Sequence, residues 1–457
     1  MPAENLQKTE ILNQLNRVLS QAKRLGMALP GWIETPGSDI NITAWLAADQ
    51  SMEKYYWRSR NGRLEIGGAG TGFSLTGESS QSALSRAGHM LAVLPDFPII
   101  FFSGRSFAPK RQADRLWTDF PDDICTIPRW MIVRRDQTFD RVCCVPVMPD
   151  SCTRDLAERV AAFNESAAVD ELPSGNYILP PLKSRSDFPD HGHWLKNVRE
   201  VLTAVELGRV EKVVLARRRE YRFGRSVDAP ELLRGLMRHN TGSFAALYQP
   251  RPGAAFVSVS PERLYRRIGT TLEIDALSST VCRGNTAAED TELAHRLLKS
   301  DKELREHAFV IEGIKYDIEP LCGSAPQSGG TDILKLEKVQ HLMTPITGTL
   351  RDGVSDEHIM SALHPTPAVG GTPRAKALEI ILNLEGFDRG WYAAPIGIVS
   401  RDFTEVAVGI RSALVRDGTV SVFSGAGIVA GSDPEMEWHE INQKDILRPL
   451  FPGEVSS

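Results

Sequence analysis

The hydrophobic residues near the start of the chain recur every three or four positions. Between residues 8 and 25 they are Ile11, Leu12, Leu15, Val18, Leu19, Ala22 and Leu25. This spacing places them on one face of a helix, and Gly26 follows as a typical helix stop. The chain is therefore predicted to open with an amphipathic helix that carries no obvious chemistry.

Shorter hydrophobic runs in the next hundred residues predict a mixture of helix and strand. Residues 83–94 have helical spacing, whereas residues 98–102, 129–134 and 141–145 have the composition of strands. An N-terminal α+β portion is therefore expected over residues 1–155.

Two stretches of this first part lack regular periodicity. The glycines of residues 67–72 superficially resemble a nucleotide-binding loop, but no amphipathic helix follows them, so a strand connection is favoured. Residues 150–190 are rich in Pro, Ser, Asp and Gly, which indicates a connecting region.

Motifs become denser after residue 190. Helices are predicted over residues 194–207, 290–314 and 434–444, and strands over 210–217, 255–260, 390–397, 406–411 and around residue 341. A rigid loop is expected at residues 364–373, and a glycine-rich turn at 425–433 is expected to lead into the last helix.

Composition narrows the class of protein. The chain has 457 residues, of which 42% are hydrophobic and 24% charged, as in a globular protein with an extensive core. A net charge of -5 without a long Lys/Arg cluster argues against a nucleic-acid partner. The six cysteines lack paired C-x-x-C spacing, so free thiols are expected rather than disulfides or a zinc site. No signal-peptide core or run of about 20 apolar residues is present, so we expect a cytoplasmic protein without a membrane partner.

The last predicted helix presents acids on one face. Glu437, Glu440 and Lys444 lie at positions i, i+3 and i+7, and two carboxylates suit a magnesium ion that keeps coordination sites for a substrate. In isolation, an exposed Glu440–Lys444 ion pair is the favoured interpretation. Glu303 and Glu306 repeat the spacing on another predicted helix, so the two helices could converge on one cation.

Two further side chains could do chemistry, and two histidines are expected to be structural. Lys212 begins an apolar strand, where loss of hydration would lower its pKa and make it a general base, although a solvated strand-end lysine is favoured in isolation. Glu262 follows Pro261 at the end of a buried strand and could be a general acid, or could simply cap the turn and pair with Arg263. His307 is expected to be structural, because magnesium prefers oxygen ligands. His341 would be a core histidine by default.

Eight motifs occur in a recognisable order. They are Lys212-Val-Val-Leu-Ala-Arg217, Ser260-Pro-Glu262, Lys302-Glu-Leu-Arg-Glu306-His307, Val339-Gln-His341-Leu342, His364-Pro-Thr-Pro-Ala368-Val369, Gly390-Trp-Tyr392, Ile410-Arg411, and Gly425-Ala-Gly-Ile-Val429 with Glu437-Trp-His-Glu440. The set resembles the chorismate-utilising enzymes, and within them the isochorismate synthases of menaquinone and siderophore pathways. The match covers residues 190–450 strongly and reaches the N-terminal part weakly through Trp117, Phe120, Pro128 and Trp130.

The resemblance implies a fold and an activity. The fold would be a single α+β domain over residues 1–457, with two packed antiparallel sheets, outer helices and a catalytic portion at 190–452. The activity would be a magnesium-dependent isomerisation of chorismate to isochorismate. Lys212 would activate water to attack ring carbon 2, and Glu262 would protonate the hydroxyl that leaves carbon 4.

The resemblance also implies ligand contacts. Glu306 and Glu440 would bind Mg2+ directly, with Glu303 and Glu437 in supporting or water-mediated roles. Arg411 and Tyr392 would hold the enolpyruvyl carboxylate, and Lys444 with the amides of Gly425 and Gly427 the ring carboxylate. Thr280, His341 and Ala368 are the other expected substrate contacts.

Subfamily features favour isochorismate as the product. Lys212 favours water over ammonia as nucleophile, Ser278 stands where aminodeoxychorismate synthases have a lysine, and Ala368 stands where salicylate synthases tend to have threonine. A salicylate synthase and a catalytically silent paralogue remain the alternatives. Ser279 replaces a usual glycine, and its side chain is expected to crowd the pocket or alter the backbone dihedrals.

The expected partners are chorismate and isochorismate. Neither an amidotransferase subunit nor nucleic acid nor a membrane is expected, and the protein would be a monomer or a homodimer.

Overall fold

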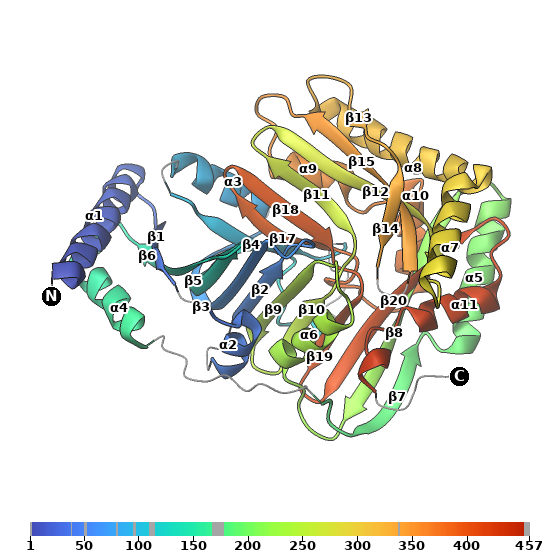
Figure 1. The fold of residues 1–457 in the computed structure, drawn as a ribbon, viewed down its shortest axis with the longest axis horizontal. Coiled ribbons are helices and arrows are strands. Elements are labelled where there is room, and N and C mark those ends of the chain that lie inside the picture. The colour runs from blue at the N-terminus through green and yellow to red at the C-terminus, as the bar shows by residue number, and fades with distance from the viewer. Residues whose placement is uncertain are drawn as a thin grey trace.

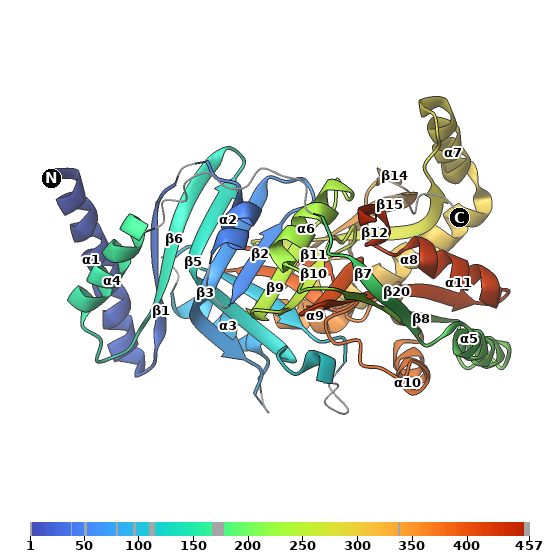
Figure 2. The ribbon, with the colours of Figure 1, turned by 90° about the horizontal axis from the view of Figure 1, so that it is seen from below.

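The computed structural model describes residues 2–37, 39–49, 53–78, 81–94, 97–108, 115–166, 178–336 and 339–451. The middle of the predicted connecting region, including Leu172 and Pro173, lies outside these residues. Figures 1 and 2 show an elongated molecule with strands along its length and helices at its ends and flanks.

Two series of antiparallel strands diverge from β5 (Asp123–Arg135). The first series runs from β5 through β3 (Leu64–Thr76), β2 (Lys54–Arg58), β9 (Ala245–Arg251), β10 (Ala254–Ser258), β19 (Ser412–Arg416), β20 (Thr419–Val429), β8 (Lys212–Phe223) and β7 (Leu182–Phe188). The second runs from β5 through β4 (Ile100–Arg105), β17 (Pro395–Ser400), β18 (Phe403–Val408), β11 (Arg263–Ile268), β12 (Thr271–Cys282) and β15 (Val339–Thr349). We call these the first sheet and the second sheet.

The remaining strands extend these sheets. They are β1 (Leu29–Pro36) and β6 (Thr138–Val147) next to β5, β13 (Gln327–Ser328) and β14 (Asp332–Lys335) on β15, and β16 (Gly371–Thr372) on β8. Each pairing among the described strands is antiparallel, so the predicted α+β fold with large antiparallel sheets is confirmed. The glycines of residues 67–72 lie inside β3, as the strand interpretation requires.

The helices gather mainly at the two ends of the sheets. At one end lie α1 (Pro2–Leu25) and α4 (Thr153–Ser166), and at the other α5 (His191–Glu206), α7 (Ala287–Lys299), α8 (Asp301–Ile318) and α11 (Pro434–Gln443) (Figures 1 and 2). Between them are α2 (Ile42–Ala48), α3 (Ala83–Val93), α6 (Ala229–Arg238), α9 (Asp356–Leu363) and α10 (Arg374–Leu384). The predicted opening helix is confirmed, with Ile11, Leu15, Val18 and Ala22 buried.

The single helix predicted over residues 290–314 is wrong. Ser300 ends α7 and caps α8, with an extended backbone (φ -78°, ψ 108°). Its hydroxyl accepts a hydrogen bond from the Glu303 amide, at 3.4 Å. Serine favours this position because its side chain replaces a missing helical hydrogen bond. Glu303 and Glu306 therefore lie in the first two turns of a new helix.

Three other boundaries differ from the prediction. The run at residues 390–397 begins as a turn and becomes β17 only at Pro395, and β18 ends at Val408, before Arg411. Gly390 (φ 51°) and Arg411 (φ 48°) adopt left-handed backbone conformations, which a strand does not accommodate. Conversely, residues 425–429 of the predicted glycine-rich turn at 425–433 are the end of β20, and the turn itself is at Gly431 (φ 83°).

The N-terminal and C-terminal parts of the chain share one hydrophobic core. Trp117 stacks on Phe423 at 5.8 Å between ring centroids, and Phe120 meets Trp391 edge-on at 5.8 Å. The approach is so close that a Cβ on Gly390 would lie 2.1 Å from the Trp117 ring. Burial of such aromatic rings helps to hold the two parts together.

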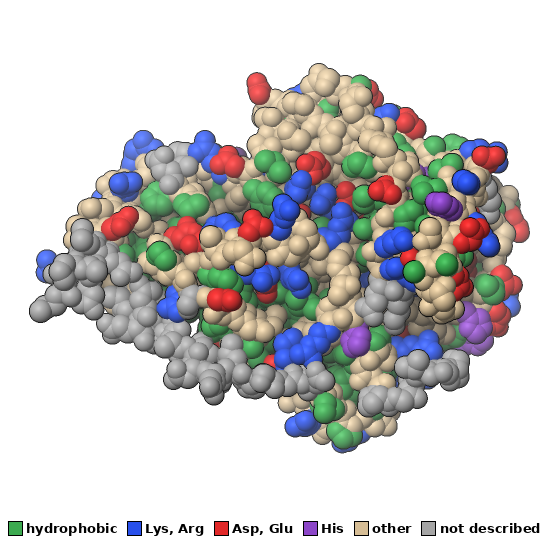
Figure 3. All heavy atoms as spheres, in the orientation of Figure 1, with side chains coloured by type: hydrophobic (Ala, Val, Ile, Leu, Met, Phe, Trp, Pro, Cys, Tyr) green, Lys and Arg blue, Asp and Glu red, His purple; other side chains and the backbone are tan. Residues whose placement is uncertain are grey.

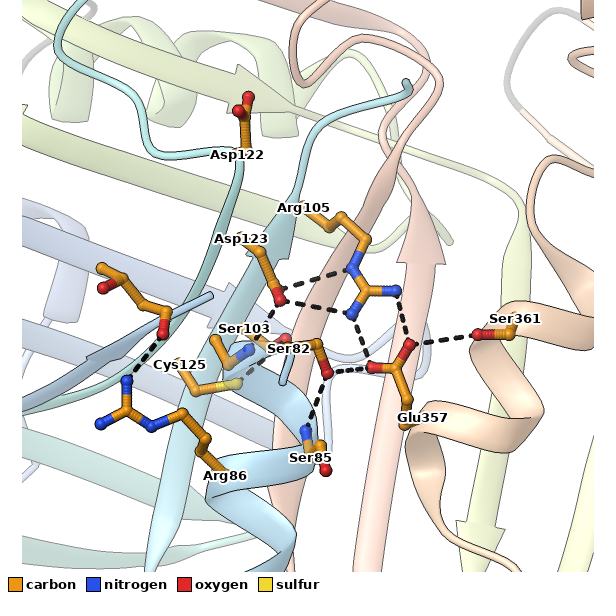
Figure 4. Close-up of polar contacts among 12 residues, drawn as sticks. Ser82, Ser85, Arg86, Ser103, Arg105, Asp122, Asp123, Cys125, Glu357 and Ser361 are labelled. Atoms are coloured by element: carbon orange, nitrogen blue, oxygen red, sulfur yellow. Dashed lines mark hydrogen bonds and ion pairs between the residues drawn. The ribbon is translucent and has the colours of Figure 1, made fainter. Parts of the chain in front are cut away.

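An ion-pair cluster adds a polar link between the same parts. Arg105 of β4 donates hydrogen bonds to Glu357 of α9 at 3.0 and 2.6 Å, and it also contacts Asp123 of β5 (Figure 4). Ser82 and Ser361 complete the hydrogen bonds of the Glu357 carboxylate. This cluster is well satisfied and structural in character.

The surface carries both signs of charge. Lys and Arg side chains are interspersed with Asp and Glu on the face drawn in Figure 3. Among the described helices, none is both long enough and apolar enough to cross a membrane.

Candidate active site

Two of the connections that carry the chain between the sheets lie against each other. One links β10 of the first sheet to β11 of the second and contains Glu262; the other links β18 to β19 and contains Arg411. The Val259 amide donates a hydrogen bond to the Arg411 carbonyl (3.0 Å), and the Val408 amide donates one to the Glu262 carbonyl (3.1 Å). Residues that are 152 and 146 positions apart in the sequence are thus fixed side by side.

Lys212 lies at the first position of β8, between strands that each supply a glycine. A Cβ on Gly371 of β16 would lie 2.2 Å from the Lys212 carbonyl oxygen. A Cβ on Gly427 of β20 would lie 2.8 Å from Lys212 Cε and 3.5 Å from Nζ. The absence of side chains at these positions leaves room for the lysine backbone on one side and for its ammonium group on the other.

The charges around Lys212 come from the residues that the motifs predicted. Burial lowers the pKa of Lys212; among neighbouring charges, Glu262, Glu440 and Glu306 raise it and Lys444 lowers it. Because these interactions decay with distance, all four groups lie near the lysine. The structure therefore brings together residues from β8, α8, α11 and the β10–β11 connection.

Glu262 has the opposite shift. Burial raises its pKa to about 7, the charge of Lys212 opposes that increase, and the charge of Asp275 reinforces it. A carboxyl with such a pKa is partly protonated at neutral pH and can donate a proton. Asp275 was not predicted from the sequence as part of the site.

Two residues predicted to hold the substrate, Arg411 and Tyr392, interact electrostatically with each other and with acids of the site. Burial lowers the pKa of the Arg411 guanidinium, on which Tyr392 and Glu440 also act. Burial raises the pKa of Tyr392 to about 12, so its hydroxyl stays protonated and can donate a hydrogen bond. A Cβ on Gly425 would lie 2.7 Å from that hydroxyl, so glycine is needed for the approach of the tyrosine.

His341 of β15 is a neutral group beside these cations. Burial lowers its pKa to about 4, and the charges of Arg411 and Lys444 contribute to the decrease. Thr280 pairs with His341 across the β12–β15 ladder, although its side chain lies outside the described atoms. Ala368 is exposed in the loop between α9 and β16.

The four predicted metal ligands come from two helices. On α11, Glu437 is partly buried, and burial raises its pKa with Glu440 as a further contributor. Glu440 is exposed and forms the expected ion pair with Lys444 (2.5 Å), which also donates to the Gly425 carbonyl at 2.9 Å. On α8, Glu303 is partly buried and Glu306 is exposed.

The described residues contain no group of three or more His, Cys, Asp or Glu close enough to hold a metal ion. Magnesium, however, often takes only one or two protein carboxylates and fills its other positions with water and substrate oxygens. Glu306 and Glu440 are exposed carboxylates from different helices that both act on Lys212. Both would offer the oxygen ligands that magnesium prefers.

His307 is structural, as predicted. Its Nδ1 is 2.6 Å from the Ser278 hydroxyl, and its Nε2 is 2.7 Å from the Thr344 hydroxyl. Both ring nitrogens are thus engaged inside the protein, and neither faces the acids of the site.

Ser279 has the altered backbone that was expected where the family has glycine. Its φ is 50°, and it interrupts the register of β12 and β15 between Ser278 and Thr280. Its hydroxyl oxygen is buried without a hydrogen-bond partner. A left-handed conformation costs a serine about 1 kcal/mol or more.

Comparison with known proteins places these features in context. A family model described as "Chorismate binding enzyme" matches residues 21–451. The "Isochorismate synthase MenF" of Bacillus subtilis is 32% identical over 77% of this chain and 74% of its own length. The "Salicylate biosynthesis isochorismate synthase" of Pseudomonas aeruginosa is 34% identical over 74% of this chain and 71% of its own. The solved structure of MenF, the menaquinone-specific isochorismate synthase from Escherichia coli, superposes with a TM-score of 0.82 at 28% identity, covering 97% of this chain and 99% of that one.

Proposed function

The chain belongs to the family of chorismate-binding enzymes, and from that premise we propose that it is an isochorismate synthase, which isomerises chorismate to isochorismate. One observation supports this most strongly: burial lowers the pKa of Lys212 and raises that of Glu262 at the same site. A base and an acid with such shifts are what addition of water and loss of hydroxide require near neutral pH.

In the proposed reaction, the neutral amine of Lys212 takes a proton from a water molecule as that water attacks ring carbon 2. The ring double bonds shift, and the bond between carbon 4 and its hydroxyl breaks. Glu262 donates a proton to the departing oxygen, so one water is consumed and one is released. The cycle leaves Lys212 protonated and Glu262 ionised, and proton exchange between them or with solvent restores the starting state.

The other charged groups suit a substrate with two carboxylates. We assign the enolpyruvyl carboxylate to Arg411 and Tyr392, because a guanidinium and a protonated phenol offer the donors that a carboxylate accepts. Lys444 and the amides of Gly425 and Gly427 are the proposed contacts of the ring carboxylate. We assign the remaining substrate contacts to neutral His341, to Thr280 and to Ala368.

Magnesium is the proposed cofactor. Glu306 and Glu440 would bind it directly, with Glu303 and Glu437 in support. When bound, the ion would neutralise the ring carboxylate and hold it among these acids.

The names of the relatives support isochorismate as the product. One relative is named for salicylate biosynthesis and another for menaquinone, yet both are called isochorismate synthases. The step common to both names is formation of isochorismate, and either pathway is compatible with it.

Product identification tests the proposal. Purified protein with chorismate and magnesium should yield isochorismate by chromatography, and removal of magnesium with a chelator should stop turnover. Salicylate plus pyruvate would identify a salicylate synthase instead. Absence of turnover of both chorismate and isochorismate would indicate a silent paralogue.

A further inference from the structure

A buried ion-pair cluster holds the short turn that carries Glu262. Asp275 of β12 has a side chain that is only 4% exposed; one arginine donates a hydrogen bond to Oδ1, and a second forms an ion pair with Oδ2, which accepts no hydrogen bond. Arg263 donates from Nη1 to Oδ1 at 3.1 Å, and Arg60 approaches Oδ2 at 2.8 Å. Carboxylates are rarely buried to this degree unless they are paired, so Asp275 depends on both arginines.

The two arginines hold the chain on both sides of Glu262. Arg263 directly follows it, whereas Arg60 donates a hydrogen bond to the carbonyl of Pro261, which directly precedes it, at 3.4 Å. Both guanidinium groups also lie over the Phe244 ring, at 5.6 Å for Arg60 and 5.9 Å for Arg263. The Phe244 amide in turn donates to the Ser260 carbonyl at 2.7 Å.

Arg60 is remote from the site in sequence. It belongs to the turn between β2 and β3, 201 positions before Pro261. The catalytic motifs all lie after residue 190, so Arg60 is a contact by which the N-terminal part reaches the turn of the proposed acid.

We propose that Arg60 and Asp275 are positioning residues for Glu262: the pair fixes the Ser260–Arg263 turn and sets the electrostatic field in which Glu262 gains and loses its proton. This inference rests on the proposed function, in which Glu262 is the general acid. Neither residue is placed against the substrate.

The direction of each effect follows from charge. Glu262 faces Lys212 of β8, Asp275 of β12, Lys444 of α11 and Tyr392 of the turn before β17. The Asp275 carboxylate raises the pKa of Glu262. Loss of the Asp275 charge should lower that pKa, and loss of the Arg60 charge should raise it because Asp275 is then less neutralised.

The experiment compares pH profiles of kcat/KM for Asp275→Asn, Arg60→Met and Arg60→Lys. We assign the limb of the profile nearest pH 7 to Glu262. Its apparent pKa should fall by about 0.5–1 unit in Asp275→Asn and rise by a similar amount in Arg60→Met. Arg60→Lys keeps the charge, so its limb should return to within about 0.2 pH unit of wild type. KM for chorismate should change less than about twofold, whereas kcat should fall by about 3- to 30-fold in Arg60→Met.

Arg105→Met is the matched control. Arg105 also comes from the N-terminal part and also joins two carboxylates, Asp123 and Glu357, but it contacts α9 rather than the turn of Glu262 (Figure 4). This variant should lower the melting temperature without moving the limb near pH 7. If Arg60→Met and Asp275→Asn behave in the same way as this control, the proposal is overturned.

A second measurement separates this proposal from the proposed function. Carbon-13 NMR of carboxyl-labelled glutamate, with Glu262→Gln to identify the resonance, follows the titration of Glu262 without any substrate. Opposite shifts in the two charge variants support the positioning role even if wild-type protein does not convert chorismate. A wild-type titration in both variants refutes the role even if conversion occurs.

Discussion

Burial lowers the pKa of Lys212 and raises that of Glu262 to about 7, and the charge of each residue partly offsets the shift of the other. The two come from different elements, the start of β8 and the connection between the sheets. A surface lysine and a turn-capping glutamate would keep pKa values near 10.5 and 4.5. The opposed shifts therefore favour an acid–base pair over the two structural interpretations.

Replacement of Lys212 by alanine should remove the proposed base. We expect kcat for chorismate to fall by about 10²–10⁴-fold or more, with an unchanged fold by circular dichroism. Lys196→Ala is the control, because Lys196 is exposed on α5 and pairs only loosely with Glu200 at 3.8 Å. Turnover of Lys212→Ala at the wild-type rate would remove Lys212 from the mechanism.

The two glycines beside Lys212 should respond differently to a methyl group. In Gly427→Ala the new Cβ meets the flexible end of the Lys212 side chain, which can move aside. We expect a loss of about 10- to 100-fold in kcat with little change in melting temperature. In Gly371→Ala the Cβ meets the rigid Lys212 carbonyl at 2.2 Å and the backbone has φ 143°, so the variant should be destabilised. Equal stability losses in both variants would contradict this distinction.

Glu262 should cost stability at alkaline pH. Its folded pKa of about 7 exceeds its ordinary value of 4.5, so the folded protein binds the proton more tightly than the unfolded chain. The resulting stability is fully present below pH 4.5 and is lost as pH rises through 7. Glu262→Gln cannot ionise and lacks this loss. The free energy of unfolding of the variant minus that of wild type should therefore rise by roughly 2–3 kcal/mol from pH 4.5 to pH 8. Urea unfolding of both proteins at the two pH values measures the difference, and a pH-independent difference would place the carboxyl in a hydrated environment.

Ser279→Gly should relieve strain in β12. Glycine adopts φ 50° readily and leaves no buried hydroxyl without a partner, so we expect the free energy of unfolding to rise by about 0.5–1 kcal/mol. Ser278→Gly is the neighbouring control. It removes the hydrogen bond to buried His307 and should destabilise by about 1–3 kcal/mol. Destabilisation by Ser279→Gly would show that the bulge is not strained.

The sequence predicted which residues come close together better than it predicted their local structure. Motif order identified Lys212 and Glu262, and helical spacing placed Glu437 and Glu440 on one face. Local patterns could not show that Tyr392 and Arg411 lie in turns. The left-handed backbone conformations at Ala393 and Arg411 depend on contacts between the two sheets. Ser300 did carry a local signal, since serine is a preferred helix cap.

Other features depend on contacts far apart in sequence. Gly427 was assigned to the substrate, and its proximity to Lys212 became visible only from the pairing of β20 with β8. Arg60 and Asp275 are 215 positions apart, and no local pattern connects them. Hydrophobic periodicity shows which face of a helix or strand is buried, but it does not show which charged group of another element lies against that face.

Oxygen labelling tests the central claim most directly. Chorismate should be incubated with the protein and magnesium in water enriched in oxygen-18, and the product identified by chromatography and mass spectrometry. Attack of water at carbon 2 predicts isochorismate that carries one heavy oxygen, located in its ring hydroxyl. Unlabelled isochorismate, salicylate with pyruvate, or unchanged chorismate would contradict the account.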